Sequence, residues 1–135
     1  FTLYYIYIYI MLINVSVGEL IDKFTILLIK QKKITNDEKL LKVKTEIEYL
    51  QPNIQEVKDK YDIDGLFEQL VIINSKLWDI EDNIRIKEKN KDFDNEFIQL
   101  ARSVYFTNDK RAHIKNIINE KTKSAIFEVK SYEKY

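Results

Sequence analysis

The sequence has few of the residues that form turns between strands and none with a thiol: it has no cysteine, one proline and two glycines among 135 residues. Without cysteine it can form no disulfide, zinc–thiolate site, iron–sulfur cluster or catalytic thiolate, and a reducing cytoplasm is the expected location. Sheet proteins need turn residues at most strand ends, so this scarcity favours a few long helices.

The sequence also lacks a net charge, because 22 basic side chains balance 22 acidic ones. Proteins that bind nucleic acid depend on an overall electrostatic attraction, so we expect no nucleic-acid partner. A chain of this length suits one domain with its own core.

Residues 1–18 contain no charged side chain, and this length approaches that of a membrane span. However, residues 5–10 alternate Tyr and Ile, which suits a strand and is the translation of an uninterrupted TATATA repeat. A basic segment and a cleavage site typical of signal peptides are also missing. We therefore expect residues 1–10 to be an upstream translation artefact, residues 11–135 to form a single helical domain, and no membrane to be a partner; a membrane anchor is the alternative.

Two helix starts are marked by capping boxes, at Ser16 with Glu19 and at Thr35 with Glu38. The first box precedes a strongly apolar run, which predicts a central helix over residues 17–33, surrounded by the others. In the second helix, apolar residues recur at spacings of three and four from Leu40 to Tyr61, and the stripe keeps its phase across Pro52. We expect one long kinked helix, with two helices broken at Gln51 as the alternative.

A third apolar stripe predicts a helix from about residue 66 to 89, and a fourth helix starts near Phe97. Its phase would place Thr107 or Asn108 and Arg111 in the core. We favour a break there, with Thr107 or Asn108 capping a fifth helix over residues 109–121; polar groups turned inward are the alternative. The predicted fold is an all-α antiparallel bundle of four main helices, with this fifth helix and a minor two-stranded ribbon from residues 12–15 and 124–129.

All three arginines and the only tryptophan fall within residues 77–85 and 100–112. Arginine offers a planar fork that suits phosphate or carboxylate. The simpler interpretation of Glu81 and Arg85 is a solvated i,i+4 pair, worth about 0.3 to 0.5 kcal/mol. The sharper hypothesis is a binding site for a small anionic ligand. Its residues would be Trp78, Glu81, Arg85, Arg102, Asn108, Asp109, Arg111 and Lys115.

Two acidic pairs at i,i+3 spacing, Glu19 with Asp22 and Asp79 with Asp82, are similar to the pairs that hold magnesium in all-helical pyrophosphohydrolases. The signal is weak, because the capping box already uses Glu19. We therefore assign no metal ligand and no cofactor. His113 is the lone histidine and is expected on a helix surface.

Three segments carry a resemblance to a known family: SVGELIDK at residues 16–23, LWDIEDNIRIKE at 77–88 and LARSVYFTNDKRA at 100–112. The chain resembles, from Met11 to about Tyr132, a family of short bacterial and phage helical proteins classified only as a domain of unknown function. The resemblance implies no activity. It does imply a genetic setting among surface-polysaccharide and glycosyltransferase genes.

These observations lead us to expect a non-catalytic binding or accessory module. Its partner would be a phosphorylated or nucleotide-sugar ligand, or an enzyme of surface-polysaccharide synthesis. One alternative is a small metal-dependent nucleotide pyrophosphohydrolase-like enzyme. The other is a structural helical oligomer, including a homo-oligomer, built on the stripe from Leu40 to Tyr61.

A chain that begins at Met11 should fold with unchanged helicity and better solubility, because residues 1–10 contribute to no helical stripe. Circular dichroism and a thermal melt would measure this. Loss of the cooperative melt on truncation would contradict the interpretation of these ten residues.

Overall fold

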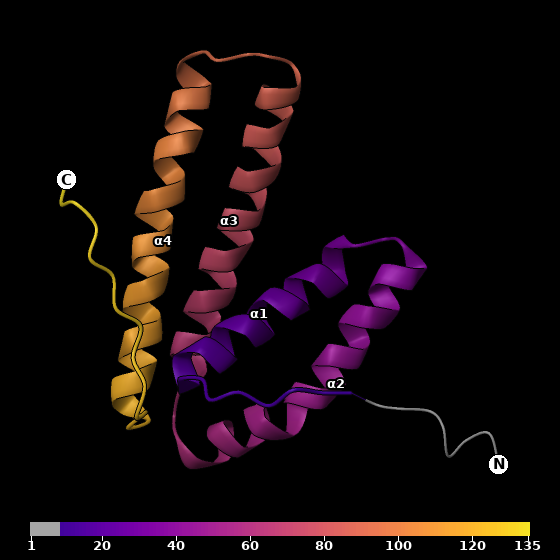
Figure 1. The fold of residues 1–135 in the computed structure, drawn as a ribbon, viewed down its shortest axis with the longest axis vertical. Coiled ribbons are helices and arrows are strands. Elements are labelled where there is room, and N and C mark those ends of the chain that lie inside the picture. The colour runs from indigo at the N-terminus through magenta and orange to yellow at the C-terminus, as the bar shows by residue number, and fades with distance from the viewer. Residues whose placement is uncertain (1–8) are drawn as a thin grey trace.

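The computed structural model describes residues 9–135, which form four helices (Figure 1). The helices are α1 (Val17–Lys33), α2 (Asp37–Lys60), α3 (Asp64–Lys89) and α4 (Asn95–Lys121). The predicted all-α class is therefore confirmed. Within the described residues no helix is long and apolar enough to cross a membrane.

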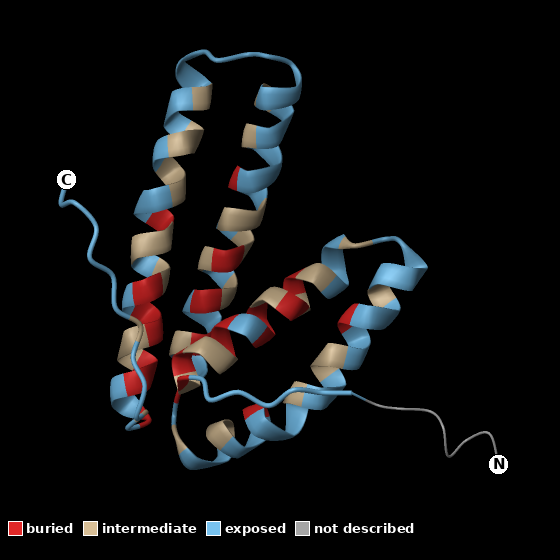
Figure 2. Cartoon of the chain, viewed as in Figure 1, coloured by how far each residue is buried: buried red, intermediate tan, exposed pale blue. Residues whose placement is uncertain are grey.

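Helix α1 is the common element of the fold, as predicted, because it packs against each of the other three helices. It pairs with α2 in one hairpin and crosses the lower halves of α3 and α4, which form a second, longer hairpin (Figure 1). The buried residues gather at this crossing, whereas the far ends of α3 and α4 form a largely exposed two-helix arm (Figure 2). Any site built from several helices must therefore lie near α1.

The core is a cluster of eight buried apolar side chains drawn from α1, α2, α3, α4 and the α2–α3 connection. Phe24 of α1 and Phe67 of α3 belong to it, with ring centroids 6.3 Å apart. Most of the α2 stripe packs against this cluster from the outside. The other core members are Ile21, Ile54, Ile63, Leu70, Ile114 and Ile118.

One of the two predicted helix caps is confirmed and the other is displaced by one residue. The Ser16 hydroxyl accepts a hydrogen bond from the Glu19 N–H at 3.0 Å. Helix α2 is capped by Asn36, whose side-chain oxygen accepts from the Lys39 N–H at 2.9 Å, so the cap predicted at Thr35 is wrong. Asparagine ranks at least as high as threonine at this position, which explains the shift. Helix α2 runs unbroken through Pro52 and is bent, as expected (Figure 1).

The predicted break near Thr107 is wrong, because α4 is continuous from Asn95 to Lys121. The other interpretation holds: Thr107 is buried, and Arg111 turns inward to the carboxylate of Asp22. A helix tolerates polar residues on its inner face when their hydrogen bonds are met by neighbouring helices.

The predicted two-stranded ribbon is also wrong, since neither residues 12–15 nor residues 124–129 form a strand. The C-terminal segment instead bonds to side chains, among them the Asn116 amide. An isolated two-stranded ribbon is only marginally stable in water, so the segment packs against α4 instead of pairing as a strand.

Replacing Ser16 or Asn36 with alanine should each lower the free energy of unfolding by about 1 kcal/mol, because each change leaves a helix N–H without its acceptor. Thr35→Ala is the matched control and should change it by less than about 0.5 kcal/mol. Urea denaturation followed by circular dichroism measures all three. Equal losses for Thr35→Ala and Asn36→Ala would contradict the assigned cap.

Candidate functional site

A buried carboxylate, that of Asp22, lies where α1, α3 and α4 meet. Its Oδ1 accepts hydrogen bonds from Asn74 Nδ2 and from Arg111 Nε, both at 2.9 Å. Arg111 Nη2 also donates to Oδ2, so the guanidinium grips the carboxylate with two donors. This bond raises the pKa of Arg111 above its ordinary value, despite partial burial. Two donors in a planar fork give the pair a fixed geometry.

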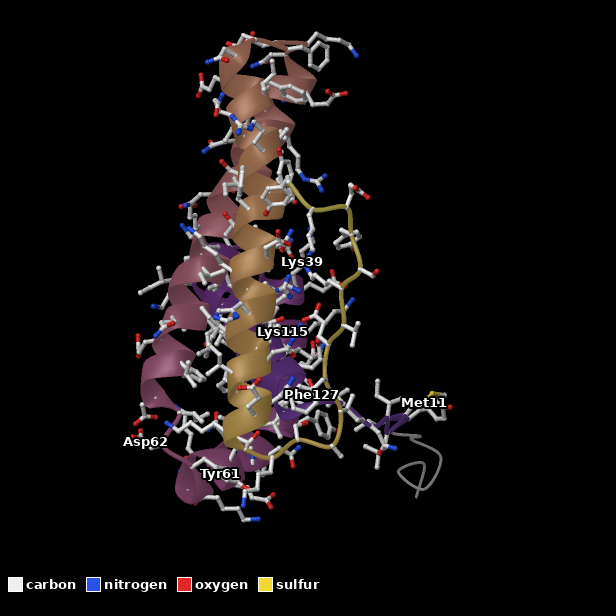
Figure 3. All side chains as sticks on the ribbon, turned by 90° about the vertical axis from the view of Figure 1, so that its left-hand side faces the viewer. Met11, Lys39, Tyr61, Asp62, Lys115 and Phe127 are labelled. Carbon is white, nitrogen blue, oxygen red and sulfur yellow. The ribbon has the colours of Figure 1, made fainter. Side chains whose placement is uncertain are left out.

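Lys115 lies one turn beyond Arg111 and is also buried. Its ammonium is 2.7 Å from Glu19 Oε2, 3.0 Å from Glu128 Oε2 and 3.8 Å from Asp22 Oδ2. Burial by itself would lower the pKa of Lys115, but the hydrogen bonds to Glu19 and Glu128 and the charge of Asp22 raise it above its ordinary value. Lys115 is therefore charged at neutral pH. Its three carboxylates come from α1 and from the C-terminal segment, which runs beside α4 (Figure 3).

Helical spacing explains how these groups meet. Arg111, Lys115 and Asn119 follow one another at i,i+4 and so share one face of α4. Gly18 of α1 lies against that face, where its N–H donates to Asn119 Oδ1 at 2.6 Å. A Cβ on Gly18 would clash with the carbonyl oxygen of Lys115 and lie 2.9 Å from Asn119 Oδ1. The absence of a side chain at Gly18 is what lets α1 approach α4 closely.

The remaining polar groups around Asp22 satisfy one another. Asn74 Nδ2 also donates to Thr25 Oγ1 at 2.9 Å, and that hydroxyl donates to the Asp22 carbonyl oxygen at 2.7 Å. Buried polar groups that are fully paired fix a single arrangement of the helices around them.

A small hollow of about 270 Å³ opens beside this network. It lies between α1, α4 and the C-terminal segment, and its lining is mainly polar. Arg111 Nη1, the nitrogen not used by Asp22, is 3.5 Å from Asn108 Oδ1, a long contact. The lining residues are Glu19, Asn108, Arg111, Ala112, Lys115, Glu128 and Lys130.

Three of the eight residues predicted for an anion site, Asn108, Arg111 and Lys115, lie together at this hollow. Asp109 is adjacent on α4 and accepts a hydrogen bond from the Tyr135 hydroxyl. Arg102 is exposed further along α4, with its guanidinium carbon 5.7 Å from the Phe106 ring centroid.

The α3 members of the predicted site are not at the hollow. Arg85 is exposed and pairs with Glu81 at 3.2 Å, as in the simpler interpretation of a solvated i,i+4 pair. It lies eleven residues beyond Asn74 on α3, about 16 Å along the helix axis. Trp78 is half-buried on the same helix and does not line the hollow.

The sequence analysis did not assign Glu128, Lys130, Asn116 or Thr25 to the site. One signal was available at Asp22, a charged residue within an apolar helix. Such a residue is almost never fully buried unless it is paired, so its presence there predicts a buried cation. Glu128 and Lys130 carry no such signal, because they lie in a segment without helical periodicity.

The two acidic pairs considered as magnesium ligands do not form a metal site in the structure. Glu19 and Asp22 contact Lys115 and Arg111, whereas Asp79 is exposed and 4.0 Å from Lys33. Among residues 9–135, no group of three or more His, Asp or Glu side chains is placed to hold a metal ion.

A second, larger hollow of about 1680 Å³ lies between residues 10–15, α1 and α2, with Ala125 and Ile126 at its edge. Its surface is mainly apolar, and none of the eight predicted site residues lines it. The predicted site residues that do meet therefore lie at the smaller hollow.

Asp22→Asn should lower the free energy of unfolding by about 3 to 5 kcal/mol, because it leaves the partly buried Arg111 without its paired carboxylate. Asp79→Asn, the same change at an exposed carboxylate, should alter it by less than about 0.5 kcal/mol. Urea unfolding of the two variants gives the comparison. Equal effects would show that Asp22 does not organise the helices.

No curated protein and no solved structure is significantly similar to the chain. A family model, described as a family of unknown function, matches residues 11–135 and so spans all four helices and the C-terminal segment. Two of the three segments singled out in the sequence, residues 16–23 and 100–112, contribute Gly18, Asp22 and Arg111 to the α1–α4 contact. The chain belongs to this family of unknown function, DUF6165.

Proposed function

We propose that the protein is a non-catalytic binding module whose hollow between α1, α4 and the C-terminal segment takes the anionic group of a ligand. The observation that carries this proposal is the meeting of three cations, Arg111, Lys115 and Lys130, around one small cavity. Two carboxylates, Glu19 and Glu128, share the lining, and a third, that of Asp22, pairs with Arg111 beside it. An anion in the hollow would bind through the cation donors that these carboxylates do not use.

The donors available to a ligand differ among the three cations. Asp22 occupies two nitrogens of Arg111 but leaves Nη1 with only the long contact to Asn108. Lys130 is exposed and forms no ion pair within residues 9–135. Lys115 is close to three carboxylates. We therefore expect Arg111 Nη1, Asn108 Nδ2 and Lys130 to make the direct contacts, while Lys115 supplies positive potential.

The size of the hollow restricts what it can hold. Sites for drug-sized ligands usually span about 300 to 1,000 Å³, and this cavity of about 270 Å³ is smaller. It suits a single phosphate or carboxylate group, as at one end of a sugar phosphate. The rest of such a ligand would lie across the rim.

Two features favour binding over catalysis. Both carboxylates closest to the cations on α4, Glu19 and Asp22, are paired with them and so are not placed as free bases. The only histidine, His113, is exposed on α4 and does not line the hollow. A magnesium-dependent hydrolase would need grouped carboxylates, and an oligomer built on the α2 stripe would need that stripe exposed. Instead, Ile54 of the stripe is buried in the core.

Addition of inorganic phosphate or glucose 1-phosphate at constant ionic strength should raise the melting temperature, because a ligand that binds only the folded chain stabilises it. Lys130→Ala should weaken the affinity about two- to fivefold, the range for an exposed charge contact. Lys134→Ala removes the same charge from the same exposed segment outside the hollow, and should leave the affinity unchanged. Thermal shift and calorimetric titration measure both.

Equal affinities for Lys130→Ala and Lys134→Ala would show that anions bind the surface non-specifically. No stabilisation of the unaltered chain by either phosphate would overturn the proposal. A response that requires magnesium would point instead to a metal-dependent site.

A further inference from the structure

The C-terminal segment, residues 124–135, turns back along α4 instead of leaving the fold (Figure 3). The reversal occurs at Lys123, whose φ of 54° is left-handed, and the Ser124 N–H donates to the Asn119 carbonyl oxygen at 2.8 Å. These are the features of a helix end that sends the chain backwards. Ser124 Oγ then accepts from the Val17 N–H at 3.3 Å, which ties the start of the segment to α1.

Glu128 is held by both its backbone and its side chain. Asn116 Nδ2 donates to the Glu128 carbonyl oxygen at 3.0 Å, and Asn116 Oδ1 accepts from the Glu128 N–H at 3.3 Å. The carboxylate meanwhile lies 3.0 Å from Lys115. A side-chain amide that bonds to both the N–H and the C=O of one residue matches the donor and the acceptor that a peptide backbone carries at each residue.

A second anchor lies at Tyr135. Its ring packs edge-on against Tyr105 and Phe106, with centroids 5.3 and 4.8 Å away, and its hydroxyl donates to Asp109. The hydrogen bond to Asp109 raises the pKa of Tyr135 to about 12. Between the two anchors, residues 129–134 are exposed. A segment with so few buried contacts opens more easily than the helices do.

We propose that this side of α4, formed by Tyr105, Asp109, Lys115 and Asn116, is a docking site for an extended peptide that carries a glutamate and, seven positions later, an aromatic residue. The chain's own residues 124–135 occupy the site as an intramolecular ligand. In the proposed complex, a segment of a partner protein with the same glutamate and aromatic residue replaces residues 124–135. The site shares Lys115 with the hollow but goes beyond the proposed anion binding and does not depend on it.

Competition between the tethered and the added segment gives a direct test. A tethered ligand acts at an effective concentration of about millimolar, so the unaltered chain should bind an added peptide weakly. Glu128→Gln in the full chain removes the charge that holds its own segment but leaves the site intact. A labelled peptide with the sequence of residues 124–135 should therefore bind this variant at least about tenfold more tightly than the unaltered chain.

Three controls distinguish specific binding of the Glu128 side chain and backbone from non-specific binding of the peptide. Glu133→Gln is the same change at an exposed glutamate of the same segment, and this chain should bind the peptide as weakly as the unaltered one. With the Glu128→Gln chain as receptor, a peptide carrying Gln in place of Glu128 should bind at least about tenfold more weakly than the unaltered peptide. A peptide methylated on the Glu128 nitrogen loses one hydrogen bond to Asn116, so its affinity should fall about two- to tenfold. Fluorescence anisotropy measures every affinity, and the peptide changes cannot disturb the fold of the receptor.

Equal affinity of the peptide for the unaltered and Glu128→Gln chains, or no binding to either, would overturn the proposal. So would equal affinity of the charged and Gln peptides. A dimer of the unaltered chain that the added peptide dissociates would identify a second copy as the donor and overturn the partner-protein source. Weaker phosphate binding in Lys130→Ala with peptide binding unchanged would separate this site from the hollow.

Discussion

The burial of the Asp22 carboxylate is the constraint on which the arrangement of α1, α3 and α4 depends. A carboxylate removed from water must be met by donors or it destabilises the fold by several kcal/mol. Asn74 of α3 and Arg111 of α4 provide those donors, so the two long helices must approach α1 at the level of Asp22. The close contact at Gly18 and the hydrogen bond to Asn119 then fix how α4 lies against α1.

The same constraint gives the protein its polar surface features. Because the inner face of α4 must supply a cation to Asp22, the next turn brings Lys115 close to Glu19 and to the C-terminal segment. The hollow exists because three elements meet around these charges without filling the space between them. Anion binding and peptide docking would therefore use groups that the fold already needs in order to pair its buried charges.

Much of the architecture follows from local patterns in the sequence. Local patterns predict three long helices, the start of the fourth, the Ser16 cap and an unbroken α2 across Pro52, because each depends on neighbours within a few residues. Three of the eight predicted site residues meet at the hollow for the same reason: Asn108, Arg111 and Lys115 lie within two turns of one helix. The prediction for the α3 residues was wrong because the local sequence does not determine which residues of α3 lie beside which residues of α4.

Two lysines show what the sequence by itself determined and what only the tertiary structure decided. Lys87 contacts Asp92, Asp94 and Glu96, all within nine residues, so its partners are fixed by the short turn between α3 and α4. Lys115 also contacts three carboxylates, but Glu19 is 96 residues away in the sequence. Arg111 is likewise 89 residues from Asp22, and whether α4 continued through Thr107 depended on that distant pairing. Local spacing determines helices, whereas the burial of a charge is decided only when helices far apart in the sequence pack together.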